Sequence, residues 1–473
     1  MSNFIIYPSI NLFLYDLKEG LGQSSDKINQ NRYNFWHKVY GNLDEHDFNE
    51  KYAQLPHHQT PDTDPIQLLN TQNAIEKFPS PLDGWYYPLQ LGDTYALQVN
   101  YSGKLNANHQ FNDDPQNLDD QPFYSLKQDL IQRLSQQTGT LGQTWLLWGQ
   151  LTTPKTDTEI EEIAQDCYTQ LLSNYNWTRD IIGKGQLNGA TLFELWYRPA
   201  NPGLSPAEFW QVYRQESHHL LIWLFPHDST PNAMRTQVQA SYYDWLCLFQ
   251  YRHKIVWSYY QSQAQKSRLK REYVEIQPAI QKIKQMTEQC EKNRIRLGHL
   301  QQTMKDHLIN LSDYAIALNA LQNQSRTLTI NLENYQYRLQ SMQEEYSGCD
   351  LKVLEKFSSE LYAQKYQRQV ASDCENFQPG LTLLENLNST LQGIIDVEQT
   401  KSDRALDNTI ALAGIGLAIS GLTATAISVQ QPQPKSYTDF SFLSSPIFFW
   451  SLLFSSPFLF ALLYRLIAHW RRR

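Results

Sequence analysis

A stripe of small and hydroxyl-bearing residues near the C-terminus has the residue types and spacing that point most directly to a chemical role. Its members recur at steps of three and four residues and would therefore share one face of a helix: Ala411, Gly414, Ala418, Gly421, Thr425 and Ser428, preceded by Asp407 and Asn408. Small side chains leave an open bore, and Thr or Ser hydroxyls replace the hydration shell of an ion. The stripe predicts the wall of an ion pathway, although close packing of membrane helices explains the same pattern.

Other reactive residue types do not form a recognisable catalytic arrangement. The sequence has no HExxH, Walker, GxSxG or paired CxxC pattern, so we expect no catalytic residues, no cofactor and no enzymatic activity. His218, His219 and His227 surround an apolar run at 220–225, and Asp228 follows. A metal site is one interpretation. We favour the other, in which these histidines mark the two ends of a strand, and the metal remains unknown.

Two apolar runs would position the stripe. Residues 409–429 and 445–464 contain no charged residue, and about 20 apolar residues suffice for a helix to cross a bilayer. The connection at 430–444 contains Pro432 and Pro434, which predicts a short turn. The sequence therefore predicts a transmembrane hairpin with basic tail at 408–473.

Basic residues predict the orientation of this hairpin. Lys401 and Arg404 precede the first run, Lys435 is the one basic residue of the connection, and four arginines follow the second run: Arg465, Arg471, Arg472 and Arg473. Positive charge stays on the cytoplasmic side of a membrane. The five widely spaced cysteines fit a reducing compartment. We therefore expect a two-span protein of the inner or cell membrane, with both termini cytoplasmic.

The rest of the chain predicts two further parts. Residues 1–255 contain strand-like runs at 145–148, 192–197 and 220–225 and a hairpin signal around Leu91-Gly92-Asp93, so we expect a cytoplasmic α/β domain. The net charge of −8 argues against nucleic acid as a partner. Residues 256–407 have the heptad spacing of a helical coiled-coil stalk. We expect the stalk to reverse at Ser347-Gly348 and to break or kink at Pro379-Gly380. The predicted fold class is thus an α+β membrane protein.

This order of segments resembles the CorA family of pentameric divalent-cation channels. The tail Trp470-Arg471-Arg472-Arg473 is similar to the basic tail that rings the membrane entrance in that family. The family motif Gly-Met-Asn is absent, and its place reads Val429-Gln430-Gln431. The resemblance concerns architecture, and it implies a homo-oligomer such as a pentamer and a divalent cation as the transported ion.

Two functions follow as hypotheses. In the first, the chain is an oligomeric channel or transporter in the lipid bilayer, and its cytoplasmic domain gates an ion pathway lined by the first membrane helix. In the second, it is a membrane-anchored scaffold or a stress or defence effector, in which the coiled coil recruits partners and the hairpin serves as an anchor.

Overall fold

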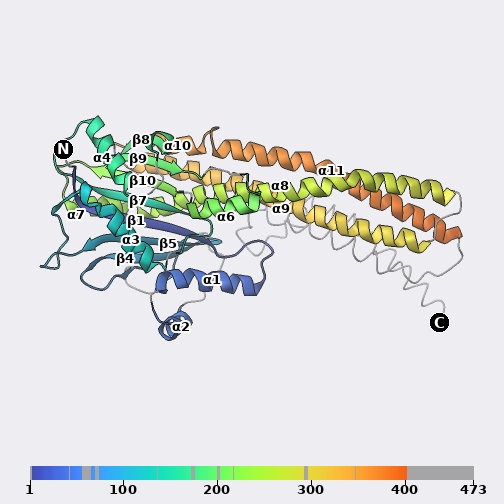
Figure 1. The fold of residues 1–473 in the computed structure, drawn as a ribbon, viewed down its shortest axis with the longest axis horizontal. Helices are drawn as coiled ribbons and strands as arrows, with labels where there is room; N and C mark the ends of the chain where they lie inside the picture. Colours follow the sequence, from blue (N-terminus) through green and yellow to red (C-terminus); the bar gives the residue numbers. More distant parts are fainter. Residues whose placement is uncertain are drawn as a thin grey trace, which may run out of the picture. The chain divides into compact units, whose positions relative to one another are not determined.

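One mixed sheet organises the N-terminal half of the chain (Figure 1). The computed structural model describes residues 3–41, 43–55, 65–69, 74–135, 137–171, 176–199, 203–216, 218–291, 297–346 and 348–401. The sheet order is β2-β4-β5-β1-β7-β10-β9-β8, with β3 beside β4 and β6 beside β1. β7 and β10 pair in parallel, and the other pairs are antiparallel. The strands are β1 (Phe4–Leu17), β2 (Ile66–Gln67), β3 (Glu76–Lys77), β4 (Leu82–Leu91), β5 (Thr94–Lys104), β6 (Pro115–Asn117), β7 (Gly142–Leu151), β8 (Ile181–Leu187), β9 (Ala190–Tyr197) and β10 (His218–Phe225).

Both faces of the sheet are buried. Successive side chains of a strand point to opposite faces, and on β10 Leu220 and Ile222 belong to one hydrophobic core while Leu221 and Trp223 belong to the other. A strand buried on both sides is a continuous apolar run, which is why the run at 220–225 was recognisable. The predicted strands at 145–148, 192–197 and 220–225 are confirmed, and so is the hairpin at Gly92, which joins β4 to β5.

Different helices cover the two faces. The first face is covered by α1 (Ser25–Tyr40), α2 (Glu45–Gln54), α3 (Pro122–Arg133), α4 (Asp157–Thr169) and α5 (Trp177–Asp180), and a short 3₁₀ helix, η1 (Leu118–Asp120), precedes α3. The second face is covered by α6 (Pro206–Glu216), α7 (Pro231–Ala240), α10 (Lys352–Ser358) and the first half of α8 (Tyr242–Glu291). Local sequence sets several helix starts. Thr156 and Glu159 form a capping box at α4, and α7 begins with a proline behind the capping residue Thr230.

Three long helices form a helical arm: α8, α9 (Leu297–Glu345) and α11 (Ala363–Lys401). The pairs Arg268–Asp313 and Arg338–Asp244 show that α8 and α9 run antiparallel. The buried residues of α11 recur every seven positions: Val370, Phe377, Leu384 and Leu391. The heptad seam predicted for this region is therefore confirmed, and the chain reverses between α9 and α10 as the Ser347-Gly348 signal predicted. The predicted boundary at 255/256 falls inside α8, and Met1–Glu398 form one compact unit.

Of the two outcomes predicted at Pro379-Gly380, the break is wrong, because α11 continues through both residues, and the kink stays a prediction. Proline removes one backbone hydrogen bond from a helix and crowds the preceding turn. Here the neighbouring helix supports the site, since the buried Tyr314 hydroxyl donates to the Phe377 carbonyl oxygen over 2.7 Å. Tertiary packing thus overrides the local helix-breaking signal.

The membrane part of the predicted fold class is also wrong. The structure has a mixed α/β sheet domain and long helices, and in the ranges that it describes no helix is long and apolar enough to cross a bilayer. The physical reason is that charged residues interrupt the apolar residues of the arm helices. In α8, for example, Lys266, Arg268 and Lys270 fall within five residues. The same finding contradicts the predicted inner-membrane or cell-membrane location and its two-span topology. The runs at 409–429 and 445–464 lie outside the described residues.

Candidate functional site

An open pocket of about 490 Å³ lies between the sheet and helices α7 and α8. Pockets for small molecules have volumes of about 300–1,000 Å³ and combine apolar walls with a few polar groups. This pocket is lined by Ile75, Lys77, Trp85, Tyr87, Asn100, Trp148, Arg235, Gln239, Tyr242 and Tyr243. Aromatic rings and two basic side chains dominate this set, and it contains no carboxylate.

The fold brings these residues together from six elements, with Lys77 on β3 and Ile75 just ahead of it. Trp85 and Tyr87 are two positions apart on β4 and share a face of the sheet, and Asn100 on β5 pairs with Trp85 in the strand register. Arg235 and Gln239 are four residues apart on α7 and therefore lie on one side of that helix. The remaining rings come from β7 and from the first two residues of α8.

The basic side of the pocket is held in place by a buried carboxylate. Arg235 Nη1 donates to Asp83 Oδ2 over 3.1 Å, and both groups hydrogen-bond to the Tyr7 hydroxyl. The guanidinium also lies 3.7 Å from the centre of the Phe111 ring, a favourable cation–π position. Burial raises the pKa of Asp83 to about 6, and Lys77 opposes that shift. Above pH 6 the pocket therefore has two cations and one neighbouring anion, and below pH 6 the two cations remain.

Fully buried amides form the floor beneath the rings. Tyr242 donates its hydroxyl to Asn11 Oδ1 over 3.2 Å, and Asn100 Nδ2 donates to the same oxygen over 3.0 Å. Several buried polar atoms in the described residues have no hydrogen-bond partner, and those of this region are Asn11 Nδ2, Gln98 Oε1 and Trp148 Nε1. An unsatisfied buried polar group costs about 1–3 kcal/mol. A ligand that reaches Trp148, which lines the pocket, would satisfy one of these groups.

A second polar cluster is enclosed where the arm leaves the sheet. Thr144 Oγ1 lies 2.9 Å from His219 Nδ1 and 2.8 Å from His253 Nε2, and His219 Nε2 lies 3.2 Å from Glu194 Oε1. Arg252 is 1 % exposed, and its guanidinium is 4.3 Å from the centre of the Trp196 ring. The adjoining cavity has about 20 Å³, which is room for one water molecule. This cluster is too enclosed to admit a substrate.

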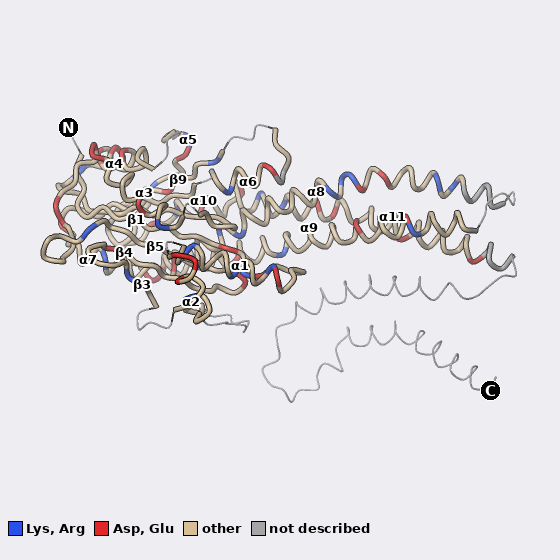
Figure 2. The backbone as a smooth tube through the Cα atoms, turned by 60° about the horizontal axis from the view of Figure 1, so that its bottom comes forward, with Lys and Arg blue, Asp and Glu red and all other residues tan. Residues whose placement is uncertain are grey.

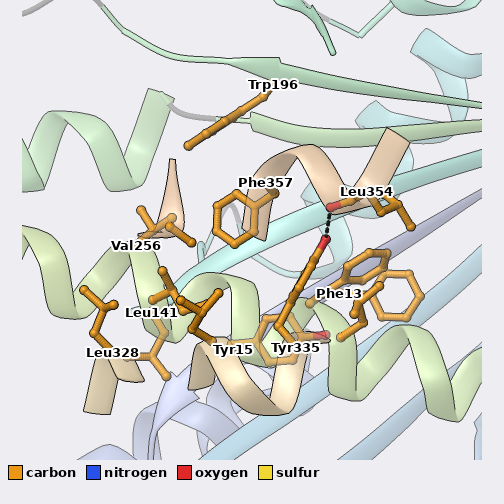
Figure 3. Close-up of a cluster of buried hydrophobic side chains, with 14 of the residues drawn as sticks. Phe13, Tyr15, Leu141, Trp196, Val256, Leu328, Tyr335, Leu354 and Phe357 are labelled. Atoms are coloured by element: carbon orange, nitrogen blue, oxygen red, sulfur yellow. Dashed lines mark hydrogen bonds between the residues drawn. The ribbon is translucent and has the colours of Figure 1, made fainter. Parts of the chain in front are cut away.

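Burial controls the charges in this enclosed cluster. It raises the pKa of Glu194 to about 7, against the lowering effect of Arg252 and Lys356. It also lowers the pKa values of His219 and His253, and Arg252 lowers both further. Both histidines are therefore neutral at pH 7. Close by, the Tyr335 hydroxyl of α9 donates to the Leu354 carbonyl of α10 over 3.0 Å (Figure 3), so the cluster lies at the junction between sheet and arm.

The sites predicted from the sequence are distributed differently. The candidate pore residues and the basic ring all lie outside the described residues: Asp407, Asn408, Ala411, Gly414, Ala418, Gly421, Thr425, Ser428, Arg465, Arg471, Arg472 and Arg473. His218 and His219 point to opposite faces of β10, and within the described ranges no three His, Cys, Asp or Glu side chains are placed to hold a metal ion.

The pocket was missed because its aromatic residues have the same spacing as core residues. Aromatic residues recur along 242–260 at helical spacing, which is typical of packing against a sheet, and Trp245 and Phe249 do pack there. Tyr242, which belongs to the same core, and Tyr243 also line the pocket. The nearest sequence signal is the basic Arg235 just ahead of this aromatic run.

Comparison with known proteins does not assign a family. No family model matches the chain, and neither the curated proteins nor the solved structures contain a match. The resemblance to CorA channels therefore stays a prediction from the sequence.

Proposed function

We propose that this protein is a ligand-responsive scaffold. Its pocket binds a small anion that carries an aromatic ring, such as a nucleotide, and its helical arm docks a protein partner. The observation that carries this proposal is the contact of Arg338 on α9 with two consecutive residues of α8. Arg338 Nη1 donates to Asp244 Oδ1 over 2.9 Å, and its guanidinium lies 5.1 Å from the centre of the Tyr243 ring. Tyr243 lines the pocket, so one arginine links the pocket wall to the arm.

The lining of the pocket supports this ligand class. Lys77 and Arg235 attract an anion, and the neighbouring Trp85 and Tyr242 rings, whose centres are 5.2 Å apart, offer faces and edges to a planar group. A cationic ligand would also favour aromatic walls, but it would meet two positive charges here. Trp148 adds a third aromatic ring to this lining.

The first turn of α8 supports transmission from the pocket to the arm. Asp244 also accepts a hydrogen bond from the Tyr346 hydroxyl over 2.7 Å, so it holds both Arg338 and Tyr346. A ligand that moves Tyr243 changes the surroundings of this carboxylate. Such a ligand alters the arm to the extent that it binds two arrangements of the first turn with different affinity.

The predicted channel function requires residues outside the part of the chain that the structure describes. An ion pathway would be lined by residues 407–428, which lie outside the described residues, and gated conduction therefore stays a prediction. The absence of enzymatic activity and the homo-oligomeric state likewise stay predictions. The scaffold proposal needs only the pocket and the arm.

Isothermal titration calorimetry on the full chain tests the pocket. The probes are ADP, which has both ring and charge, adenosine, which lacks the charge, and pyrophosphate, which lacks the ring. We expect ADP to bind most tightly and Arg235→Gln to weaken it about tenfold, as expected for loss of a charge-assisted hydrogen bond. The matched control is Arg271→Gln on an exposed part of α8, which should leave the affinity unchanged. Failure of all three probes to bind, or equal affinity in both variants, would overturn the proposal.

A further inference from the structure

The outer side of α9 carries a second apolar stripe that does not take part in the arm's own seam. We call it the α9 stripe and define it as Ile309, Ile316, Asn323, Ile330 and Tyr337. Its four apolar members are 60 %, 50 %, 55 % and 74 % exposed, in that order. Single exposed apolar residues are ordinary in proteins. These recur every seven residues over four heptads, so they lie on one side of α9.

The arm does not use this repeat. Leu311, Leu318 and Leu332 belong to the buried seam of α9 and are at most 6 % exposed. Ile316, Asn323 and Tyr337 each follow one of these leucines by five residues, which places them on the opposite side of the helix. The seven-residue spacing places Ile309 and Ile330 on the same side. The first and last stripe residues are 28 positions apart, which makes the stripe about 42 Å long. Between Asp313 and Arg326 α9 carries no charged residue, and Figure 2 shows α9 largely tan along its middle.

We infer that the α9 stripe binds the α9 stripe of a second copy of this chain. The stripe is symmetric about Asn323, with an apolar residue seven and fourteen positions away on each side. A two-fold axis at Asn323 therefore places apolar against apolar residues, and it places the two asparagines together. Self-complementarity of this kind is what a two-fold interface requires. A buried asparagine pair also specifies the register of paired helices, because each amide both donates and accepts.

Charges beside the stripe favour this occupant. Consider first an antiparallel pair centred on Asn323. On one flank Asp313 faces the partner's Asn334, and Ala320 faces the partner's Thr327. On the other flank Arg326 faces the partner's Asn319. In a parallel pair, Arg326 faces the partner's Thr327. Neither arrangement opposes two like charges, which would weaken pairing. A partner of different sequence would need an apolar heptad stripe with its own central polar residue.

This inference rests on the docking role of the arm in the proposed function, and it is independent of the pocket. The experiment is mass photometry and sedimentation velocity of the full chain without ligand. We expect the mass of the particle to fall twofold in the double variant Ile316→Glu/Ile330→Glu. The matched control Val274→Glu/Leu361→Glu changes two residues that are each 67 % exposed and lie off the stripe, and it should keep the wild-type mass. Circular dichroism melting of both variants reports whether the fold is retained.

Substitutions of Asn323 provide the second part of the test. Asn323→Ile should tighten association at least tenfold, because a buried asparagine lowers the stability of a helix pair while it specifies register. Asn323→Lys should weaken association to the same extent. A dimer with a micromolar dissociation constant is populated at roughly 50 µM. A wild type that is monomeric at that concentration would overturn the inference. An oligomer of unchanged mass in the double variant would also overturn it. In either case ADP calorimetry would still report on the pocket.

Discussion

The hydroxyl of Tyr314 on α9 donates a hydrogen bond to the carbonyl oxygen of Phe377 on α11 over a distance of 2.7 Å. Both residues are buried in the arm, and Pro379 and Gly380 follow Phe377 on α11 after one intervening residue. A side chain at position 380 would overlap the Tyr314 ring and hydroxyl. Two residues 63 positions apart in the sequence therefore keep α11 helical through a proline-glycine pair.

This contact predicts a specific pattern of stability changes. Tyr314→Phe should lower the free energy of unfolding by about 1 kcal/mol, the usual value for one hydrogen bond. Gly380→Ala should lower it by about 1–3 kcal/mol through overpacking, although alanine favours a helix. The matched control Gly393→Ala has nothing within 4 Å of the added methyl group, so it should stabilise by about 0.5–1 kcal/mol.

Urea denaturation measures all three variants. The Tyr314→Phe and Gly380→Ala effects should be less than additive in the double variant, because both act on the same contact. Equal effects of Gly380→Ala and Gly393→Ala would show that the Tyr314 contact does not form.

The enclosed cluster predicts a dependence of stability on pH. Burial raises the pKa of Glu194 from 4.5 to about 7, so between these values the folded chain binds a proton that the unfolded chain has lost. Stability from this group therefore falls as the pH rises from about 4.5 to about 7, by an amount on the order of 3 kcal/mol. His219 and His253 act in the opposite direction below pH 6.5, because burial lowers their pKa values.

The variant Glu194→Gln separates the two contributions. Chemical denaturation at pH 5, 6, 7 and 8 should show the wild type losing stability relative to the variant as the pH rises. A difference between them that does not change with pH would mean that Glu194 titrates alike in both states.

The pocket predicts a dependence of affinity on pH. Below pH 6 Asp83 becomes neutral, and the two cations near it then attract an anion more strongly. Cyclic AMP suits this measurement because its phosphodiester keeps one charge across the range. We expect its affinity to rise about three- to tenfold from pH 7 to pH 5, the size expected for one screened charge. In Asp83→Asn the affinity should stay nearly constant, and a pH effect of equal size there would contradict the assignment to Asp83.

The contact between pocket and arm predicts an uncoupled variant. In Arg338→Gln the pocket lining is intact, so ADP should bind within about twofold of the wild-type affinity. Hydrogen exchange at 335–345 of α9 should slow on ADP binding in the wild type and not in the variant. If ADP slows hydrogen exchange of α9 in both proteins, Arg338 does not couple the pocket to the arm.

The regular helices and strands could be predicted from the sequence because their signals are local. The apolar run at 220–225 and the turn at Gly92 are short-range patterns, and so is the heptad series of α9. The behaviour of Pro379 was not predictable, since it depends on Tyr314 from another helix. The pocket was not predictable either. It needs β4, β5 and β7 in one sheet beside α7, and Trp85 and Arg235 are 150 residues apart in the chain.

Helix α8 packs on the sheet through Trp245 and Phe249 and enters the arm seam through Leu269, Ile276 and Ile283. Because α8 belongs to both the sheet domain and the arm, recombination at a loop could not transfer the arm alone to another protein. The length of the arm is also constrained. An insertion that keeps all seams aligned must add seven residues to α8, to α9 and to α11 together, so homologues of this fold should differ in arm length by matched heptads in all three helices.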